Sequence, residues 1–183
     1  MKKIVLTESQ YGRLQTNLLE MTMRSYIFDW DDNILYMPTT IKMERKTSLG
    51  WVPVDVSTSQ FANIRDNKDF KLRDDDPKIA FADFRDSEPF IRDTEEAINN
   101  SRFAPSADKF KEALIYANPF AINTARGHKP EVLKEGVKLF ITMVLDRDEK
   151  KFMIDNIRKT LRQSKGLNDE QVIDLYLDVM LWL

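Results

Sequence analysis

Two short runs of apolar residues interrupt the mixed pattern of apolar and polar positions along the chain. The first spans 26–28 and continues into Asp29-Trp30-Asp31-Asp32, and the second spans 120–122 and continues into Asn123-Thr124. A short apolar run bounded by polar residues is typical of a strand buried on both faces of a parallel sheet. We therefore predict two core strands, each of which ends in polar side chains.

Elsewhere, apolar residues recur every three or four positions behind polar capping residues, which predicts amphipathic helices. The predicted helices cover about 8–22, 93–100, the stretch from Ser106 to Asn118, Pro130 to Leu145, Asp146 to Gly166, and Asn168 to the end. The last of these is apolar on almost every side, which is typical of a buried helix. Because it stops abruptly at Trp182 and Leu183, we expect the chain to be a piece of a longer protein.

Between the two predicted core strands the pattern changes to regular alternation. Residues 40–45 and 51–56 each alternate apolar with polar side chains, and Gly50 ends the stretch that separates them. This pattern predicts a β-hairpin. Pro53 indicates that the second strand lies at a sheet edge, because proline has no backbone N–H to donate.

Composition narrows the function classes without selecting one. The 183 residues carry a net charge of −2, contain no cysteine and a single histidine, and are 42% hydrophobic and 32% charged. The lack of cysteine excludes disulfides and thiolate chemistry, and one histidine excludes a multi-histidine metal site. No apolar run approaches the ~20 residues that span a bilayer. We expect a cytoplasmic protein with neither a membrane nor nucleic acid as partner.

The carboxylates behind the first strand are the strongest candidates for chemistry. Side chains alternate along a strand, so Asp29 and Asp31 should leave it on one side and Trp30 on the other. Ligands of open α/β sheets bind beyond the carboxyl ends of the strands. Two carboxylates held close together repel each other, and a bound cation relieves this repulsion. We predict a metal site at Asp29 and Asp31, with a pair of capping aspartates as the alternative.

The order of these elements resembles that of the haloacid dehalogenase-like (HAD) hydrolases. Two motifs carry the likeness, Phe28-Asp29-Trp30-Asp31-Asp32-Asn33 and Ala121-Ile122-Asn123-Thr124-Ala125-Arg126. The resemblance implies an α/β fold with a HAD-like (Rossmannoid) parallel-sheet core, which is incomplete in this chain. The implied organisation is a core over 26–36 and 106–183, a hairpin-containing insert or cap over 37–105, and an N-terminal helical appendage over 1–25.

The resemblance also implies a mechanism. Asp29 would be the nucleophile that forms an aspartyl-phosphate, and Asp31 would be the general acid and then the general base. Mg²⁺ would bind Asp29, the Asp31 backbone carbonyl and the phosphate, and would offset their mutual repulsion. Thr124 would hold a phosphoryl oxygen, and Arg126 would add a charge-assisted contact to the substrate.

The chain departs from the HAD pattern in two ways. Asp32 and Asn33 stand where the superfamily usually has a small residue and a threonine or valine. The third-motif lysine and the later acidic residues are not evident, because only helices are predicted beyond Thr124. A strand over 140–145 that ends at Asp146 is the alternative that would supply acids. Alternatives for the lysine are Lys129, Lys134 and Lys138.

Three function hypotheses follow from these observations. The first is a Mg²⁺-dependent phosphohydrolase of the HAD type that acts on a small phosphorylated compound or a nucleotide end. The alternative is a catalytically incomplete HAD-like protein with a structural or binding role, for example a virion component or the subunit of an assembly. Its protein partner would dock on the N-terminal helix or on the apolar C-terminal helix. A module that processes nucleic-acid ends has little support, because no basic stripe with interleaved aromatic residues is present.

Overall fold

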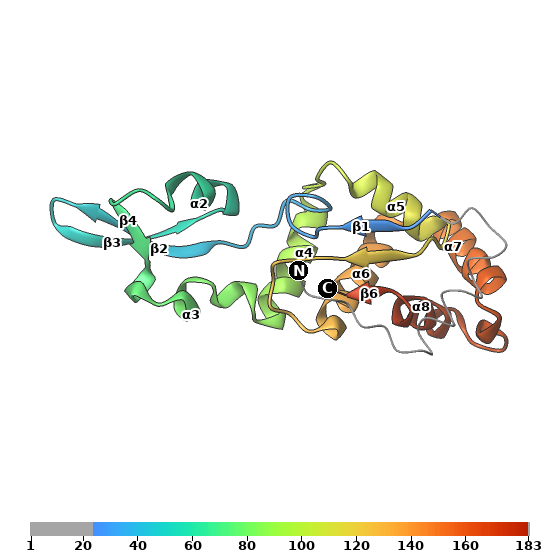
Figure 1. The fold of residues 1–183 in the computed structure, drawn as a ribbon. Coiled ribbons are helices and arrows are strands. Elements are labelled where there is room, and N and C mark those ends of the chain that lie inside the picture. The colour runs from blue at the N-terminus through green and yellow to red at the C-terminus, as the bar shows by residue number, and fades with distance from the viewer. Residues whose placement is uncertain (1–23, 183) are drawn as a thin grey trace.

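The computed structural model describes residues 24–182, which form a mixed α/β structure. Figure 1 shows two lobes: a large lobe with a parallel sheet, and a small lobe with an antiparallel sheet, at the left. The small lobe consists of residues 41–84 and the large lobe of the remaining described residues. None of the helices described there is long and apolar enough to cross a membrane. The predicted helix over 8–22 lies outside the described residues.

The sheet of the large lobe has the strand order β1-β5-β6, and both strand pairs are parallel. The strands are β1 (Tyr26–Phe28), β5 (Phe120–Ile122) and β6 (Leu181–Trp182). The two predicted core strands are therefore confirmed, and they are direct neighbours. Since both run in the same direction, the residues that follow β1 and β5 emerge at the same edge of the sheet.

Five α-helices accompany this sheet in the described part of the chain. They are α4 (Ser87–Asn99), α5 (Ala107–Ile115), α6 (Pro130–Val144), α7 (Arg147–Thr160) and α8 (Asp169–Asp178). Helix α6 packs on α4, α5 packs on α7, and α7 packs on α8. The predicted pairing of Asn168 with Gln171 at the start of α8 is present, and Asp146 caps α7 as predicted, in a capping box with Glu149. Residues 140–144 belong to α6, so a strand does not start there.

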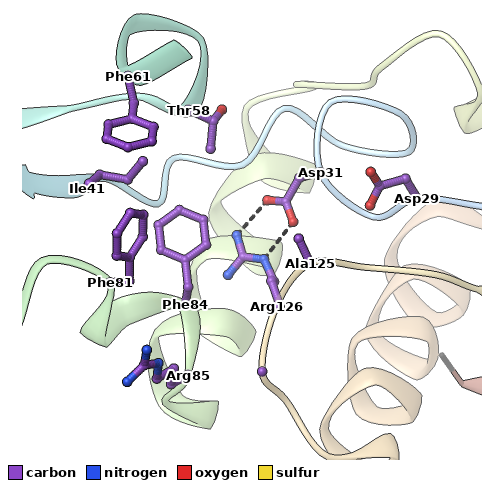
Figure 2. Close-up of a pocket in the computed structure, with 11 residues that line it drawn as sticks. Asp29, Asp31, Ile41, Thr58, Phe61, Phe81, Phe84, Arg85, Ala125 and Arg126 are labelled. Carbon is purple, nitrogen blue, oxygen red and sulfur yellow. Dashed lines mark hydrogen bonds and ion pairs between the residues drawn. The ribbon is translucent and has the colours of Figure 1, made fainter. Parts of the chain in front are cut away.

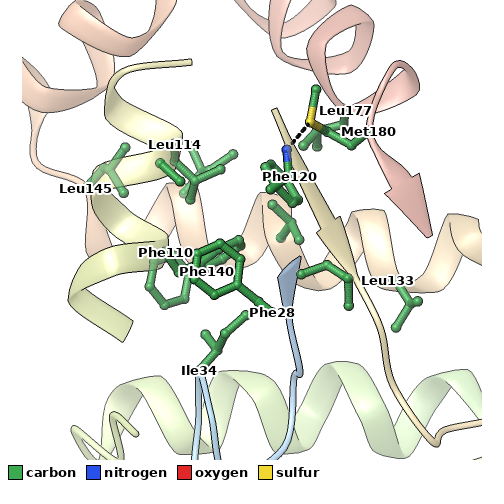
Figure 3. Packing of buried hydrophobic residues seen from close by; sticks show 14 of the residues in the cluster. Phe28, Ile34, Phe110, Leu114, Phe120, Leu133, Phe140, Leu145, Leu177 and Met180 are labelled. Atoms are coloured by element: carbon green, nitrogen blue, oxygen red, sulfur yellow. Dashed lines mark hydrogen bonds between the residues drawn. The ribbon is translucent and has the colours of Figure 1, made fainter. Parts of the chain in front are cut away.

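The core of the large lobe is centred on aromatic residues (Figure 3). Phe110 of α5 is fully buried, and its ring lies 5.1 Å from that of Phe28 and 5.1 Å from that of Phe140, edge to face in both cases. Phe120 stacks against it in the same way from β5. Phe110 thus joins the sheet to α6 and fixes the distance between them.

The prediction for the C-terminal stretch was wrong in part. Helix α8 ends at Asp178, and Leu181 and Trp182 form the third strand of the parallel sheet. Met180 turns into the core, where its sulfur lies 3.2 Å from the backbone N–H of Phe120 (Figure 3). An apolar run without clear periodicity fits a buried strand as well as a buried helix. Strand pairing with β5 decides between the two here.

The expectation that β1 is buried on both faces was also wrong. Phe28 is buried, but the side chain of Ile27 is 74% exposed. Within the described residues, β1 pairs with β5 alone and is an edge of this sheet. One face of β1 therefore packs on the core and the other meets solvent.

The small lobe confirms the predicted hairpin. Strand β2 (Ile41–Thr47) pairs with β3 (Gly50–Val56), and β3 with its Pro53 is an edge of the sheet, as expected. A third strand, β4 (Phe70–Leu72), covers the other side of β2 and was not predicted. Short helices complete this lobe: α2 (Thr58–Ile64), η1 (Arg73–Asp75), α3 (Pro77–Ala80) and η2 (Ala82–Phe84).

Helix α4 begins six residues before the predicted start at Asp93, at Ser87. Asp93 is therefore not a capping residue; it lies inside the helix and is buried. Phe90, one turn earlier, packs against α6 at Gly136, where an added Cβ would approach the Phe90 ring to 2.7 Å. Glycine at position 136 lets α4 and α6 approach closely. This close contact fixes the position of α4 and therefore of Asp93.

Candidate functional site

The ends of β1 and β5 meet at a cavity of about 340 Å³ between the two lobes (Figure 2). The backbone N–H of Asn123 donates to the carbonyl of Phe28 over 2.8 Å, which continues the pairing of the strands into the loops. The cavity is lined by Asp29, Asp31, Ile41, Thr58, Phe61, Phe81, Phe84, Arg85, Ala125, Arg126 and Gly127. Three of the four predicted site residues are among them.

The predicted alternation of side chains after β1 is present. Asp29 and Asp31 both line the cavity, while Trp30 between them is fully buried in the core. Asp32 follows with a φ of 56°, a left-handed conformation that aspartate tolerates better than most residues. Its carboxylate accepts a hydrogen bond from the Thr58 hydroxyl over 3.0 Å, which ties this loop to α2 of the small lobe.

The guanidinium of Arg126 is bonded to Asp31 and does not project into the open part of the cavity. Its Nε lies 2.7 Å from one carboxylate oxygen of Asp31, and its Nη2 lies 2.6 Å from the other, so the pair is bidentate. The two residues are 95 positions apart in the sequence. The side chain of Arg126 is 1% exposed and that of Asp31 is 17% exposed. A buried pair of this geometry fixes both groups and leaves neither oxygen of Asp31 unbonded.

The ion pair continues into a chain of polar side chains that is buried at Thr39 and Asp93 and ends at the exposed Arg92. Nη2 of Arg126 also donates to the hydroxyl of Thr39 over 2.8 Å, and that hydroxyl donates to Asp93 over 2.6 Å. Arg92 donates two hydrogen bonds to the second oxygen of Asp93. Two aspartates and two arginines alternate along this chain, so its formal charges cancel.

The remaining nitrogen of Arg126, Nη1, is buried and has no hydrogen-bond partner among the described residues. The guanidinium instead lies 4.8 Å from the ring of Phe84 and 5.3 Å from the ring of Phe90. Aromatic rings stabilise a cation near their faces but do not replace a hydrogen-bond acceptor. Nη1 is therefore a buried donor without an acceptor among the described residues, and the neighbouring rings stabilise only the charge of the guanidinium.

Thr124 is not part of the cavity wall. Its hydroxyl accepts a hydrogen bond from the backbone N–H of Arg126 over 3.2 Å, a local turn at the end of β5. Such side-chain-to-backbone bonds shape the turn in which they occur. In this structure Thr124 thus orients the backbone that carries Arg126, and its contact with phosphate stays a prediction.

The loop after β5 is also held to the segment that leads into α4. Nδ1 of His128 lies 3.1 Å from the carbonyl oxygen of Arg85, and the ring packs 4.8 Å from that of Phe90. Burial lowers the pKa of His128, and the nearby charge of Arg126 lowers it further. The His128 ring is therefore neutral at neutral pH. It supports the loop and does not line the cavity.

The carboxyl group of Asp29 has a pKa above the usual value for aspartate. Its pKa is raised, first by burial, and further by the charges of Asp31 and Asp32, while the backbone N–H of Trp30 opposes the rise. Crowding of carboxylates at one strand end is the condition that a cation relieves.

This shift predicts a pH dependence of stability. Because the pKa of Asp29 is higher in the folded than in the unfolded protein, ionisation lowers the free energy of unfolding as pH rises from about 4. We expect Asp29→Asn to be more stable than the parent protein at pH 7 and equally stable below about pH 4. Urea unfolding at both pH values measures this. A stability difference that does not change with pH would contradict the assignment, and Asp66→Asn, at a side chain that is 93% exposed, is the control.

The described residues around Asp29 offer few ligands for the predicted Mg²⁺. Within residues 24–182 no three His, Asp or Glu side chains come together as a metal-binding group. Both oxygens of Asp31 are bonded to Arg126, so Asp29 supplies the carboxylate for a cation. Mg²⁺ is commonly held by one or two carboxylates together with water and substrate phosphate oxygens. Asp29 is thus the carboxylate that would hold such an ion, together with water and the oxygens of a phosphorylated substrate.

Sequence reasoning missed two polar residues that hold the site together, Thr39 and Asp93. Thr39 follows Met37-Pro38 and resembles a turn residue in sequence. Asp93 carried a detectable signal, because it falls on the apolar stripe that Phe90, Ala97 and Ile98 form once α4 starts at Ser87. A charged residue on the buried face of a helix is rarely left without a partner.

Comparison of the chain with protein-family models, with curated proteins and with solved structures found no match.

Proposed function

We propose that this chain is a Mg²⁺-dependent phosphohydrolase that acts on a small phosphorylated compound through Asp29. The observation that carries the proposal is the position of Asp29. It lies at the carboxyl end of β1, on the wall of a cavity that also exposes Asp31, with a raised pKa. In open α/β sheets this edge is where ligands bind. The HAD-like order of the motifs supports the same assignment.

The chemistry assigned to the residues of this chain has two steps. A carboxylate oxygen of Asp29 attacks the phosphorus of a phosphomonoester, the bond from phosphorus to the alcohol oxygen breaks, and Asp31 gives that oxygen a proton. Water then attacks the aspartyl-phosphate, Asp31 takes a proton from it, and inorganic phosphate leaves as Asp29 is regenerated. For Asp31 to transfer a proton, one of its two hydrogen bonds with Arg126 has to open; Thr39 remains as an acceptor for Arg126.

The charge of the cavity explains the need for a cation. Asp29 and Asp31 line it together with Arg85 and Arg126, and the bidentate bond of Arg126 neutralises Asp31 and not Asp29. A phosphate dianion that approaches Asp29 would be repelled. A Mg²⁺ ion held by Asp29 and the Asp31 carbonyl would screen this repulsion and polarise the phosphoryl group.

A second candidate function is binding of phosphorylated compounds without turnover. The bidentate bond of Arg126 to Asp31 favours it, because it occupies both oxygens of the residue assigned to proton transfer. In that case the cavity would recognise a phosphate ester and leave it intact. This candidate corresponds to the catalytically incomplete protein with a binding role.

One experiment separates the two candidates. The full chain is incubated with p-nitrophenyl phosphate and a panel of phosphomonoesters, with Mg²⁺ or with EDTA, and inorganic phosphate is measured. Release that depends on Mg²⁺ and stops with EDTA is the expected result. Calorimetry with a non-hydrolysable phosphonate runs in parallel. Binding without release would support the second candidate, and the absence of both would reject the two together.

A further inference from the structure

The cavity has an aromatic half that the chemistry of Asp29 does not use. Phe61 from α2 and Phe81 and Phe84 around η2 line it together with Ile41 at the start of β2. Figure 2 shows these side chains on one side of the Arg126–Asp31 pair and Asp29 on the other. All four come from the small lobe, while both carboxylates come from the large lobe.

The aromatic rings are held in fixed relative positions. Phe61 and Phe81 meet edge to face at 5.6 Å between ring centroids, and Phe81 and Phe84 do so at 6.1 Å. The three rings also pack against the buried apolar cluster of the small lobe, which is formed by Ile41, Met43, Val56 and Ala80. Each of the rings nevertheless remains partly exposed, and each lines the cavity. Their accessible surface is thus a rigid apolar wall.

A ligand of mixed character matches this cavity. Its volume of about 340 Å³ is at the lower end of the range for small-molecule sites. One end offers the Asp29 carboxylate and a candidate metal position, which suit a phosphate. The other end offers aromatic faces and edges, which suit a flat ring. Hydroxyl groups placed against that wall would lose their hydrogen bonds to water without replacement.

We propose that the site selects phosphomonoesters whose alcohol carries a flat aromatic ring, as a nucleoside monophosphate does, over sugar and polyol phosphates. This inference rests on the proposed function for the position of the phosphate. The small lobe then provides the selectivity and the large lobe the reaction. The link between Asp32 and Thr58 keeps the two parts of the cavity in register.

Matched substrate pairs test the proposal. Adenosine 5′-monophosphate and ribose 5-phosphate both carry the phosphate on the 5-hydroxyl of ribose, and benzyl phosphate and cyclohexylmethyl phosphate share a primary alcohol and a six-membered ring. We expect kcat/KM to be roughly five- to tenfold higher for the aromatic member of each pair. Equal values, or a preference for the non-aromatic member, would overturn the proposal.

Substitutions in the aromatic wall test whether its rings cause the preference for aromatic substrates. Phe81→Leu and Phe61→Leu remove one ring each and should bring the ratio of kcat/KM values close to one. Leu49→Ser, at a side chain of the hairpin tip that is 98% exposed, should leave the ratio unchanged. If the ratio survives both phenylalanine replacements, the aromatic wall is not its source and the proposal fails.

Measuring the binding of phosphonates tests the aromatic preference even if the protein does not hydrolyse phosphate esters. Should no substrate release phosphate, the phosphohydrolase proposal fails, and calorimetry compares benzylphosphonate with cyclohexylmethylphosphonate on the same protein. Tighter binding of the benzyl compound would support the aromatic preference by itself. Equal affinity, or no binding of either compound, would reject it.

Discussion

Asp29→Asn is expected to lower the rate of phosphate release by roughly 10³-fold or more, since it removes the nucleophile itself. An amide nitrogen and a neutral carbonyl oxygen do not attack phosphorus, and the amide is a poorer ligand for Mg²⁺ than a carboxylate. The side chain keeps its size, so the wall of the cavity keeps its shape. The measurement is kcat/KM with Mg²⁺ for the best phosphomonoester of the panel.

The matched control for this variant is Asp32→Asn. It makes the same chemical change three residues further along the same loop, and the amide oxygen can still accept the hydrogen bond from Thr58. We expect its kcat/KM to remain within a few-fold of the parent value. Comparable losses in both variants would mean that Asp29 acts through the charge of the loop and not as nucleophile.

The stability of Asp29→Asn relative to the parent protein distinguishes a catalytic from a structural role of Asp29. The raised pKa of this carboxyl means that its charge is unfavourable in the folded protein. Asp29→Asn should therefore lose activity while it gains stability at pH 7. A residue kept for structure would show the opposite combination. Functional sites commonly hold such groups at the expense of stability.

The parts of this fold that sequence could predict depend on local chemistry. Asn168 with Gln171 forms a capping box within four residues, and the hairpin over 41–56 is set by alternation and by the turn at Gly50. Caps and turns are satisfied by near neighbours, so a single sequence contains the information for them. The same holds for the alternation that places Asp29 and Asp31 on the cavity wall and Trp30 in the core.

The parts that sequence could not predict depend on distant partners. The apolar stretch over 179–182 is compatible with a helix, and only pairing with β5 makes it a strand. The Asp-x-x-Glu pattern at Asp93 has the form of a cap, but Asp93 instead accepts hydrogen bonds from the buried Thr39 hydroxyl, 54 residues away, and from Arg92. The bond between Arg126 and Asp31 is of the same kind. The site was therefore predictable as a location, and its hydrogen bonds were not.

Arg126→Met is expected to lower the free energy of unfolding by about 3 kcal/mol, the lower end of the range for breaking a buried ion pair. The methionine retains an apolar stem that packs between Phe84 and Phe90, so the main loss is electrostatic. Asp31 would keep its charge without its partner, and the Thr39 hydroxyl would lose a donor. The partial exposure of Asp31, 17%, lets water offset some of this loss. Urea unfolding at pH 7 gives the value.

The double variant Arg126→Met, Asp31→Leu shows whether the loss comes from the pair. With both charges removed, no carboxylate remains buried without a partner, and we expect the double variant to be more stable than Arg126→Met alone. The coupling energy from the full mutant cycle should be at least about 1 kcal/mol, because the two side chains are in direct contact. Additive effects would mean that Asp31 is solvated independently of Arg126. In that case its carboxylate would be available for proton transfer without any bond to open, and the binding-only function would lose the observation that favours it.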